Sequence, residues 1–74
     1  MSGKLPSASG KQVIAALERD GFVHVKTKGS HAKLRHDDRV LTVIVPLHRE
    51  LAKGTLRSIL RQTNLTVDRL RELL

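Results

Sequence analysis

The residues best suited to chemistry lie in one short segment, KTKGSHAKLRH, which runs from Lys26 to His36. His31 follows a Gly-Ser pair there and is surrounded by lysines and an arginine. An imidazole with an ordinary pKa near 6.5 can accept a proton at neutral pH. RNA carries its own nucleophile, the 2′-hydroxyl, so its cleavage requires a base and cations that stabilise charge on the phosphoryl oxygens. The segment has these groups, although a histidine in a basic patch also occurs in proteins that catalyse nothing.

The local pattern predicts which of these side chains share a surface. Residues 22–28 and 31–36 alternate as strands do, and Gly29-Ser30 between them is a turn. In 31–36, the apolar pair Ala32 and Leu34 alternates with the basic residues. If that pair faces a core, its neighbours face outward. Strict alternation puts His24 on the face of the lysines of 22–28, opposite its valines. The expected basic face carries Lys26, Lys28, His31, Lys33 and Arg35.

Other elements must supply the core under this sheet. A helix is predicted from the Ser9 N-cap to Gly21, and a third strand over 39–46 after a tight turn at Asp37-Asp38. A second helix is predicted from Thr55, as N-cap, to Asn64, and Thr66 caps a short last helix. The expected buried stripes of the helices are Val13, Ile14 and Leu17, then Leu56, Ile59, Leu60 and Thr63, then Val67, Leu70 and Leu74. The prediction is an α+β domain, α-β-β-β-α plus a terminal helix, with an antiparallel sheet packed on the helices by one face.

Composition restricts the partners. The 74 residues are expected to form one domain, 1–74, with residues 1–8 as an N-terminal extension. Fourteen Lys and Arg against seven Asp and Glu give a net charge of +7, which favours an acidic partner such as RNA. Phe22 is the only aromatic residue, which argues against base stacking on aromatic platforms. No apolar run is long enough to span a membrane, no signal peptide is evident and there is no cysteine, so we expect a cytoplasmic protein.

Three longer stretches resemble the HicA (YcfA-like) toxin family of toxin–antitoxin pairs. They are LPSASGKQVIAALERDGF, KGSHAKLRH and VPLHRELAKGTLRSILRQTNL, and together they span about residues 5–70. The Gly29-Ser30-His31 motif and the Val45-Pro46-x-His48 motif, followed by Gly54-Thr55-Leu56, are specific in this order and spacing. Gln12 and Ala32 depart from the usual pattern, which has an acidic residue in the first helix and a larger residue after the histidine.

The resemblance implies a fold similar to the double-stranded-RNA-binding domain. It implies a metal-independent endoribonuclease that cleaves mRNA and needs no cofactor, with His31 as the catalytic residue. It also implies a partner, a HicB-type antitoxin that covers the active site. Two alternatives remain: a non-catalytic double-stranded-RNA-binding module, and an interaction domain whose basic face only meets an acidic protein. The first would concentrate lysines at the start of the last core helix, where GTLRSIL has one arginine.

The remaining candidates each have a structural and a functional interpretation. Gly29 suits a turn with positive φ and also allows RNA to approach, and Ser30 fits the turn or orients His31. His36 lies five residues from His31, so we expect it on the other face as a structural residue rather than a general acid. We expect His24 to be a solvated strand residue and His48 to hold its loop by hydrogen bonds. The histidine spacings match no metal-ligand pattern. The basic side chains contact phosphate or are merely solvated. Arg57 and Arg61 share one helix face, where they bind RNA, bind acidic residues of an antitoxin, or do neither.

Overall fold

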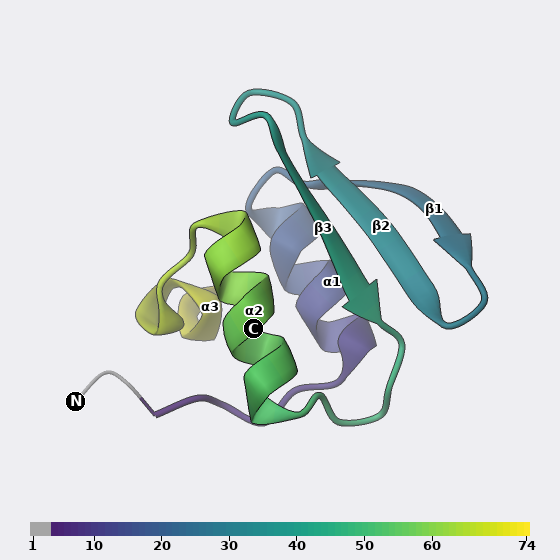
Figure 1. Cartoon of the computed structure of the whole chain (residues 1–74). Helices are drawn as coiled ribbons and strands as arrows, with labels where there is room; N and C mark the ends of the chain where they lie inside the picture. Colours follow the sequence, from purple (N-terminus) through teal and green to yellow (C-terminus); the bar gives the residue numbers. More distant parts are fainter. Residues whose placement is uncertain (1–3) are drawn as a thin grey trace.

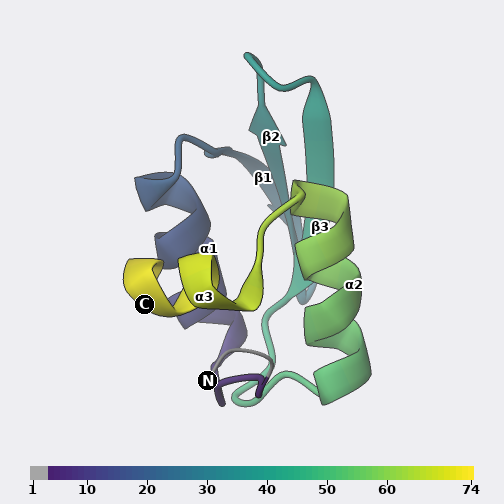
Figure 2. The ribbon, with the colours of Figure 1, turned by 90° about the vertical axis from the view of Figure 1, so that its left-hand side faces the viewer.

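A three-stranded sheet carries three helices on one of its faces in the computed structural model, which describes residues 4–74 (Figures 1 and 2). The elements are α1 (Gly10–Arg19), β1 (Val23–Lys28), β2 (His31–His36), β3 (Leu41–Pro46), α2 (Lys53–Thr63) and α3 (Val67–Leu73). This order confirms the predicted α+β arrangement. Residues 1–3 of the expected N-terminal extension lie outside the described part, while Ala8 of the same segment is buried and its carbonyl accepts from the Leu51 amide at 2.9 Å.

The sheet is antiparallel with β2 at its centre, in the order β1-β2-β3. Ala32 and Leu34 of β2 are fully buried, as are Val43 and Val45 of β3. These side chains face the helices, which lie to the left of β1 and β2 in Figure 1. The opposite face of the sheet is therefore open, and period-2 alternation places the other residues of β2 on it.

The core is made by helix stripes packed on that sheet. The predicted residues of α1 and α2 are buried there except Ile14, which is only partly buried and packs against the core. Thr63 satisfies its hydroxyl by donating to the Ile59 carbonyl at 2.8 Å. The predicted stripe of the last helix is wrong at one position. Leu73 is buried and Leu74 is 43% exposed, because α3 ends at Leu73 and its stripe closes there.

Two helix starts differ in how well they follow capping rules. Ser9 caps α1 as predicted, and Gln12 completes a capping box: its side chain accepts from the Ser9 amide at 2.8 Å and its own amide donates to the Ser9 hydroxyl. The N-cap predicted at Thr55 is wrong, because the N-cap is Ala52, three residues earlier, and α2 begins at Lys53. Ala52 has no side-chain cap, so burial of Leu51 and Leu56 sets this start instead.

The connection between β2 and β3 is longer than predicted. It spans four residues, Asp37 to Val40, because His36 pairs with Leu41. Val40 takes a positive φ of 54° there and is 87% exposed. The tight turn at Asp37-Asp38 and a third strand beginning at residue 39 are therefore wrong. No helix within residues 4–74 is long and apolar enough to cross a membrane.

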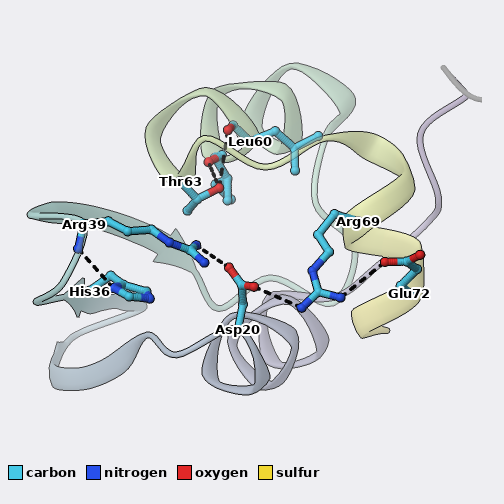
Figure 3. Close-up of polar contacts among 8 residues, drawn as sticks. Asp20, His36, Arg39, Leu60, Thr63, Arg69 and Glu72 are labelled. Carbon is cyan, nitrogen blue, oxygen red and sulfur yellow. Dashed lines mark hydrogen bonds and ion pairs between the residues drawn. The ribbon is translucent and has the colours of Figure 1, made fainter.

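A charged cluster joins this connection to two helices (Figure 3). Asp20, the C-cap of α1, accepts from Arg39 at 2.6 Å and from Arg69 of α3 at 3.2 Å, while its side chain is only 4% exposed. Burial acts to raise the pKa of Asp20, but the hydrogen bonds and charges of Arg39 and Arg69 outweigh it, so that pKa lies below its ordinary value. The hydrogen bond to Glu72 and, after it, the contact with Asp20 raise the pKa of Arg69.

Candidate active site

The open face of the sheet contains a hollow of about 430 Å³ at the end where β2 begins. Its lining comes from all three strands: Lys26 and Lys28 of β1, His31 and Lys33 of β2, and Ile44 of β3. Four of the side chains predicted for the basic face are thus brought together. The hollow is shallow and open to solvent, so a long polymer can lie across it.

A bulge in β1 places the two lysines of this strand in the hollow. His24 pairs with Leu34, but Lys26 pairs with Lys33, so Val25 is an extra residue between them. Paired residues share a face, and Lys28 likewise lies opposite His31. The predicted strict alternation of 22–28 is therefore wrong. The lysines after the bulge face outward, whereas His24 lies on the same face of the sheet as Leu34, the face that carries the helices.

His31 is held at the first position of the central strand. In the two-residue loop before it, Gly29 has a φ of 60°, whereas the φ of Ser30 is not positive. This combination indicates a type II′ hairpin turn. His31 pairs with Lys28 of β1 on one side and with Pro46 of β3 on the other. The Leu47 amide donates to the Ser30 carbonyl at 2.7 Å. Pairing on both sides thus fixes the main chain that carries the exposed imidazole, beside a turn that a Cβ on Gly29 would not crowd.

The hollow is strongly positive. None of the ion pairs formed within residues 4–74 includes Lys26, Lys28 or Lys33. The acidic residues lie on α1 and its C-cap, in the β2–β3 connection, in the segment before α2 and on α3: Glu18, Asp20, Asp37, Asp38, Glu50, Asp68 and Glu72. No strand in the described part of the chain carries an acid, so three ammonium groups face solvent without a neutralising partner there and can attract an anion.

Two predicted residues lie away from the hollow. Arg35 is exposed on the same face but lies four residues along β2 from His31, about 13 Å, and its Nε donates to Asp37 at 2.6 Å. His36 is 7% exposed on the helix side, packs edge-on against Phe22 with ring centroids 5.0 Å apart, and accepts from the Arg39 amide (Figure 3). The prediction that His36 is structural and faces away from His31 agrees with this placement.

The other two histidines also lie outside the lining. His24 is exposed as predicted, and its ring Nε2 lies 2.8 Å from the Thr27 hydroxyl across the bulge. His48 is exposed, and it is its backbone carbonyl that holds the loop, by accepting from the Gly10 amide at 2.9 Å. Among residues 4–74 no three His, Cys, Asp or Glu side chains gather in a way that could hold a metal ion.

Ile44 is the lining residue that sequence reasoning missed. It pairs with Lys33, faces outward and is 44% exposed. The third strand is apolar almost throughout, a pattern typical of a strand with neighbours on both sides, but β3 is an edge strand. The signal was present in Thr42, because period 2 puts Ile44 on the face of that hydroxyl and opposite Val43 and Val45.

Comparison with known proteins gives one assignment. The family model described as the HicA toxin of bacterial toxin–antitoxin systems matches residues 10–65, about three quarters of the chain. The matched region begins at the first residue of α1, includes all three strands and ends just after α2. A search of curated proteins gave no match. The chain belongs to the HicA toxin family, and it is accordingly the toxin of a toxin–antitoxin pair.

Proposed function

We propose that this toxin is a metal-independent endoribonuclease that cleaves mRNA in the hollow around His31 and so inhibits translation. The observation that carries the proposal is the exposed imidazole of His31 among three lysines that have no ion-pair partner within the described chain. An exposed cluster of like charges without counter-charges is unfavourable for folding alone, so a polyanionic substrate accounts for it better than a solvated surface does.

The groups present suffice for transesterification within RNA. His31 removes the proton of a 2′-hydroxyl, and the freed oxygen attacks the adjacent phosphorus. Lys26, Lys28 and Lys33 stabilise the negative charge that grows on the phosphoryl oxygens. The bond from phosphorus to the 5′ oxygen breaks, and that oxygen takes a proton from a lysine ammonium or from water. The products are a 2′,3′-cyclic phosphate and a 5′-hydroxyl.

Cleavage of RNA by the purified protein in EDTA tests this mechanism. We expect cutting that persists in EDTA, with cyclic phosphate at one new end and a 5′-hydroxyl at the other. A matched strand with 2′-deoxy sugars should bind and stay intact, because it lacks the nucleophile. Cutting of the deoxy strand, or loss of all activity in EDTA that Mg²⁺ restores, would contradict the proposal.

One observation favours a second candidate, a non-catalytic double-stranded-RNA-binding module. Because α2 starts at Lys53, its first turns carry two exposed cations, Lys53 and Arg57, four residues apart on one face, where one arginine was expected. Such a module requires cations there to meet phosphates. It predicts tight binding of duplex RNA with no cleavage by pure protein, an outcome that the EDTA experiment separates from the first.

The family also implies an antitoxin partner. We propose that a HicB-type antitoxin covers the hollow and neutralises its lysines with acidic side chains. Expression of the toxin alone should then arrest growth, and co-expression of the antitoxin should restore it. A pure interaction domain, the third hypothesis, would bind the antitoxin without any growth arrest when expressed alone.

A further inference from the structure

Among residues 4–74, Ile44 is the only one that lines the hollow with an apolar side chain. Five large apolar residues within residues 4–74 are at least 40% exposed, and the other four lie elsewhere: Val23, Val25, Val40 and Leu74. An apolar side chain of this size on an open sheet face, ringed by lysines, adds nothing to the core. Its position calls for a ligand that is apolar in one part and anionic in another.

The register fixes where that ligand part would lie. His31 is opposite Pro46, and Lys33 is opposite Ile44, so His31 and Ile44 are diagonal neighbours across β2 and β3. Such residues lie about 7–8 Å apart. In a ribonucleotide the 2′-hydroxyl and the base are attached to adjacent carbons of the sugar. A nucleotide whose 2′-hydroxyl meets His31 therefore has its base within reach of Ile44.

We propose that Ile44 contacts the base of the nucleotide whose 2′-hydroxyl is activated, and that the hollow accordingly takes unpaired RNA. The inference rests on the proposed function. The flat apolar face of the base covers Ile44 while the flanking phosphates meet the lysines. A base in a duplex is stacked on both of its faces and paired along one edge, so it cannot turn into the hollow. Phe22, the one aromatic residue, is 3% exposed, so the aliphatic side chain takes the place that aromatic platforms have elsewhere.

A double-mutant cycle between protein and RNA tests this contact. The cleavage position is first mapped on a single-stranded RNA. Binding is then measured by anisotropy on the same strand with one 2′-deoxy sugar at that position, with and without its base. For wild-type protein we expect removal of the base to weaken binding about five- to tenfold, at the low end of base stacking. Ile44→Ala should lose a similar factor with the intact strand and nothing further with the abasic strand.

Two more variants make the cycle specific. Ile44→Phe should restore or exceed wild-type affinity for the intact strand only, because an aromatic ring stacks better on a base. Val23→Ala, which removes a 50%-exposed valine outside the lining, should leave both strands unaffected. Each variant is checked for native circular dichroism.

Additive losses, or unchanged RNA binding by Ile44→Ala, would overturn the inference, as would an Ile44→Ala variant that loses only antitoxin binding. If the wild-type protein cuts mapped RNA while the cycle shows no coupling, this inference alone is wrong. If it cuts no RNA under any of the conditions, the proposed function is wrong and the inference with it.

Discussion

Lys26 lies directly opposite Lys33 across the β1–β2 pair, so two like charges face each other on an open sheet surface. The pairing exists because Val25 is an extra residue that turns the second half of β1 outward. Like charges in this position destabilise a sheet. The arrangement makes sense if a phosphate lies between the ammonium groups, because an anion converts the repulsion into two attractions.

Lys26→Gln should therefore stabilise the free protein while weakening RNA binding. We expect the free energy of unfolding to rise by about 0.2–1 kcal/mol at low salt, and less at high salt. The slope of log K against log salt for single-stranded RNA should fall by about 0.7 if one phosphate contact is lost. Lys4→Gln, which removes an exposed lysine far from the strands in sequence, is the control and should change neither. Unchanged RNA affinity of Lys26→Gln would remove this lysine from the site.

Asp20→Asn should destabilise the fold through the cluster that joins α1, the β2–β3 connection and α3. The amide no longer carries the charge that Arg39 and Arg69 contact. We expect a loss of about 1.5–3 kcal/mol in urea unfolding at pH 7, the range for hydrogen bonds to charged groups. Asp38→Asn is the matched control, because Asp38 is exposed and lies next to Arg39 in the β2–β3 connection. Equal small effects of both variants would show that the cluster contributes little.

The same carboxylate predicts a pH dependence. The pKa of folded Asp20 lies below its ordinary value, because Arg39 and Arg69 outweigh the effect of burial. Its contribution is thus fully present above the ordinary carboxyl pKa near 3.9 and is lost as the pH falls through the lower folded pKa. The stability difference between wild type and Asp20→Asn should stay constant from pH 7 to about 5 and shrink below pH 4. A difference that grows towards acid would contradict the sign.

Much of the site was predictable where a buried face fixes the register. The alternation of Ala32 and Leu34 with His31 and Lys33 could place the basic residues of β2 correctly, because the apolar pair had to enter the core. β1 offered no such constraint. All six of its residues are exposed, so nothing in their pattern reveals the bulge at Val25. Its lysines lie on the expected face, but they do so because of the bulge and not because the whole strand alternates.

Two of the errors arise from tertiary contacts, and a third arises from the end of a helix. The start of α2 follows the burial of Leu51 and Leu56 rather than the capping preference of Thr55. The long β2–β3 connection brings Arg39 to Asp20, a partner nineteen residues away. Leu74 continues the helical period of α3, but the helix ends before it. Local propensity encodes neither the burial of Leu51 and Leu56 nor the contact of Arg39 with Asp20.

Gly10 should be intolerant of a side chain, because α1 begins against the end of β3. A Cβ on Gly10 would overlap the carbonyl oxygen of Pro46, the residue opposite His31. Gly10→Ala should cost about 1–3 kcal/mol of stability, the range for overpacking, and should slow RNA cleavage by shifting the strand end beside His31. Gly54→Ala in α2 is the control, since a Cβ there meets nothing within 4 Å, and it should cost no stability. Thermal unfolding and cleavage rates measure both effects.

The most direct test of the account is RNA cleavage in EDTA by wild type, His31→Ala and His24→Ala, each with circular dichroism. His24 is an exposed histidine on the opposite side of β1 from the lysines, so it matches His31 in type but lies outside the hollow. We predict that His31→Ala folds, binds RNA and fails to cut, while His24→Ala cuts at the wild-type rate. Equal cutting by wild type and a folded His31→Ala would show that His31 is a surface residue in a basic patch, and the catalytic account would be wrong.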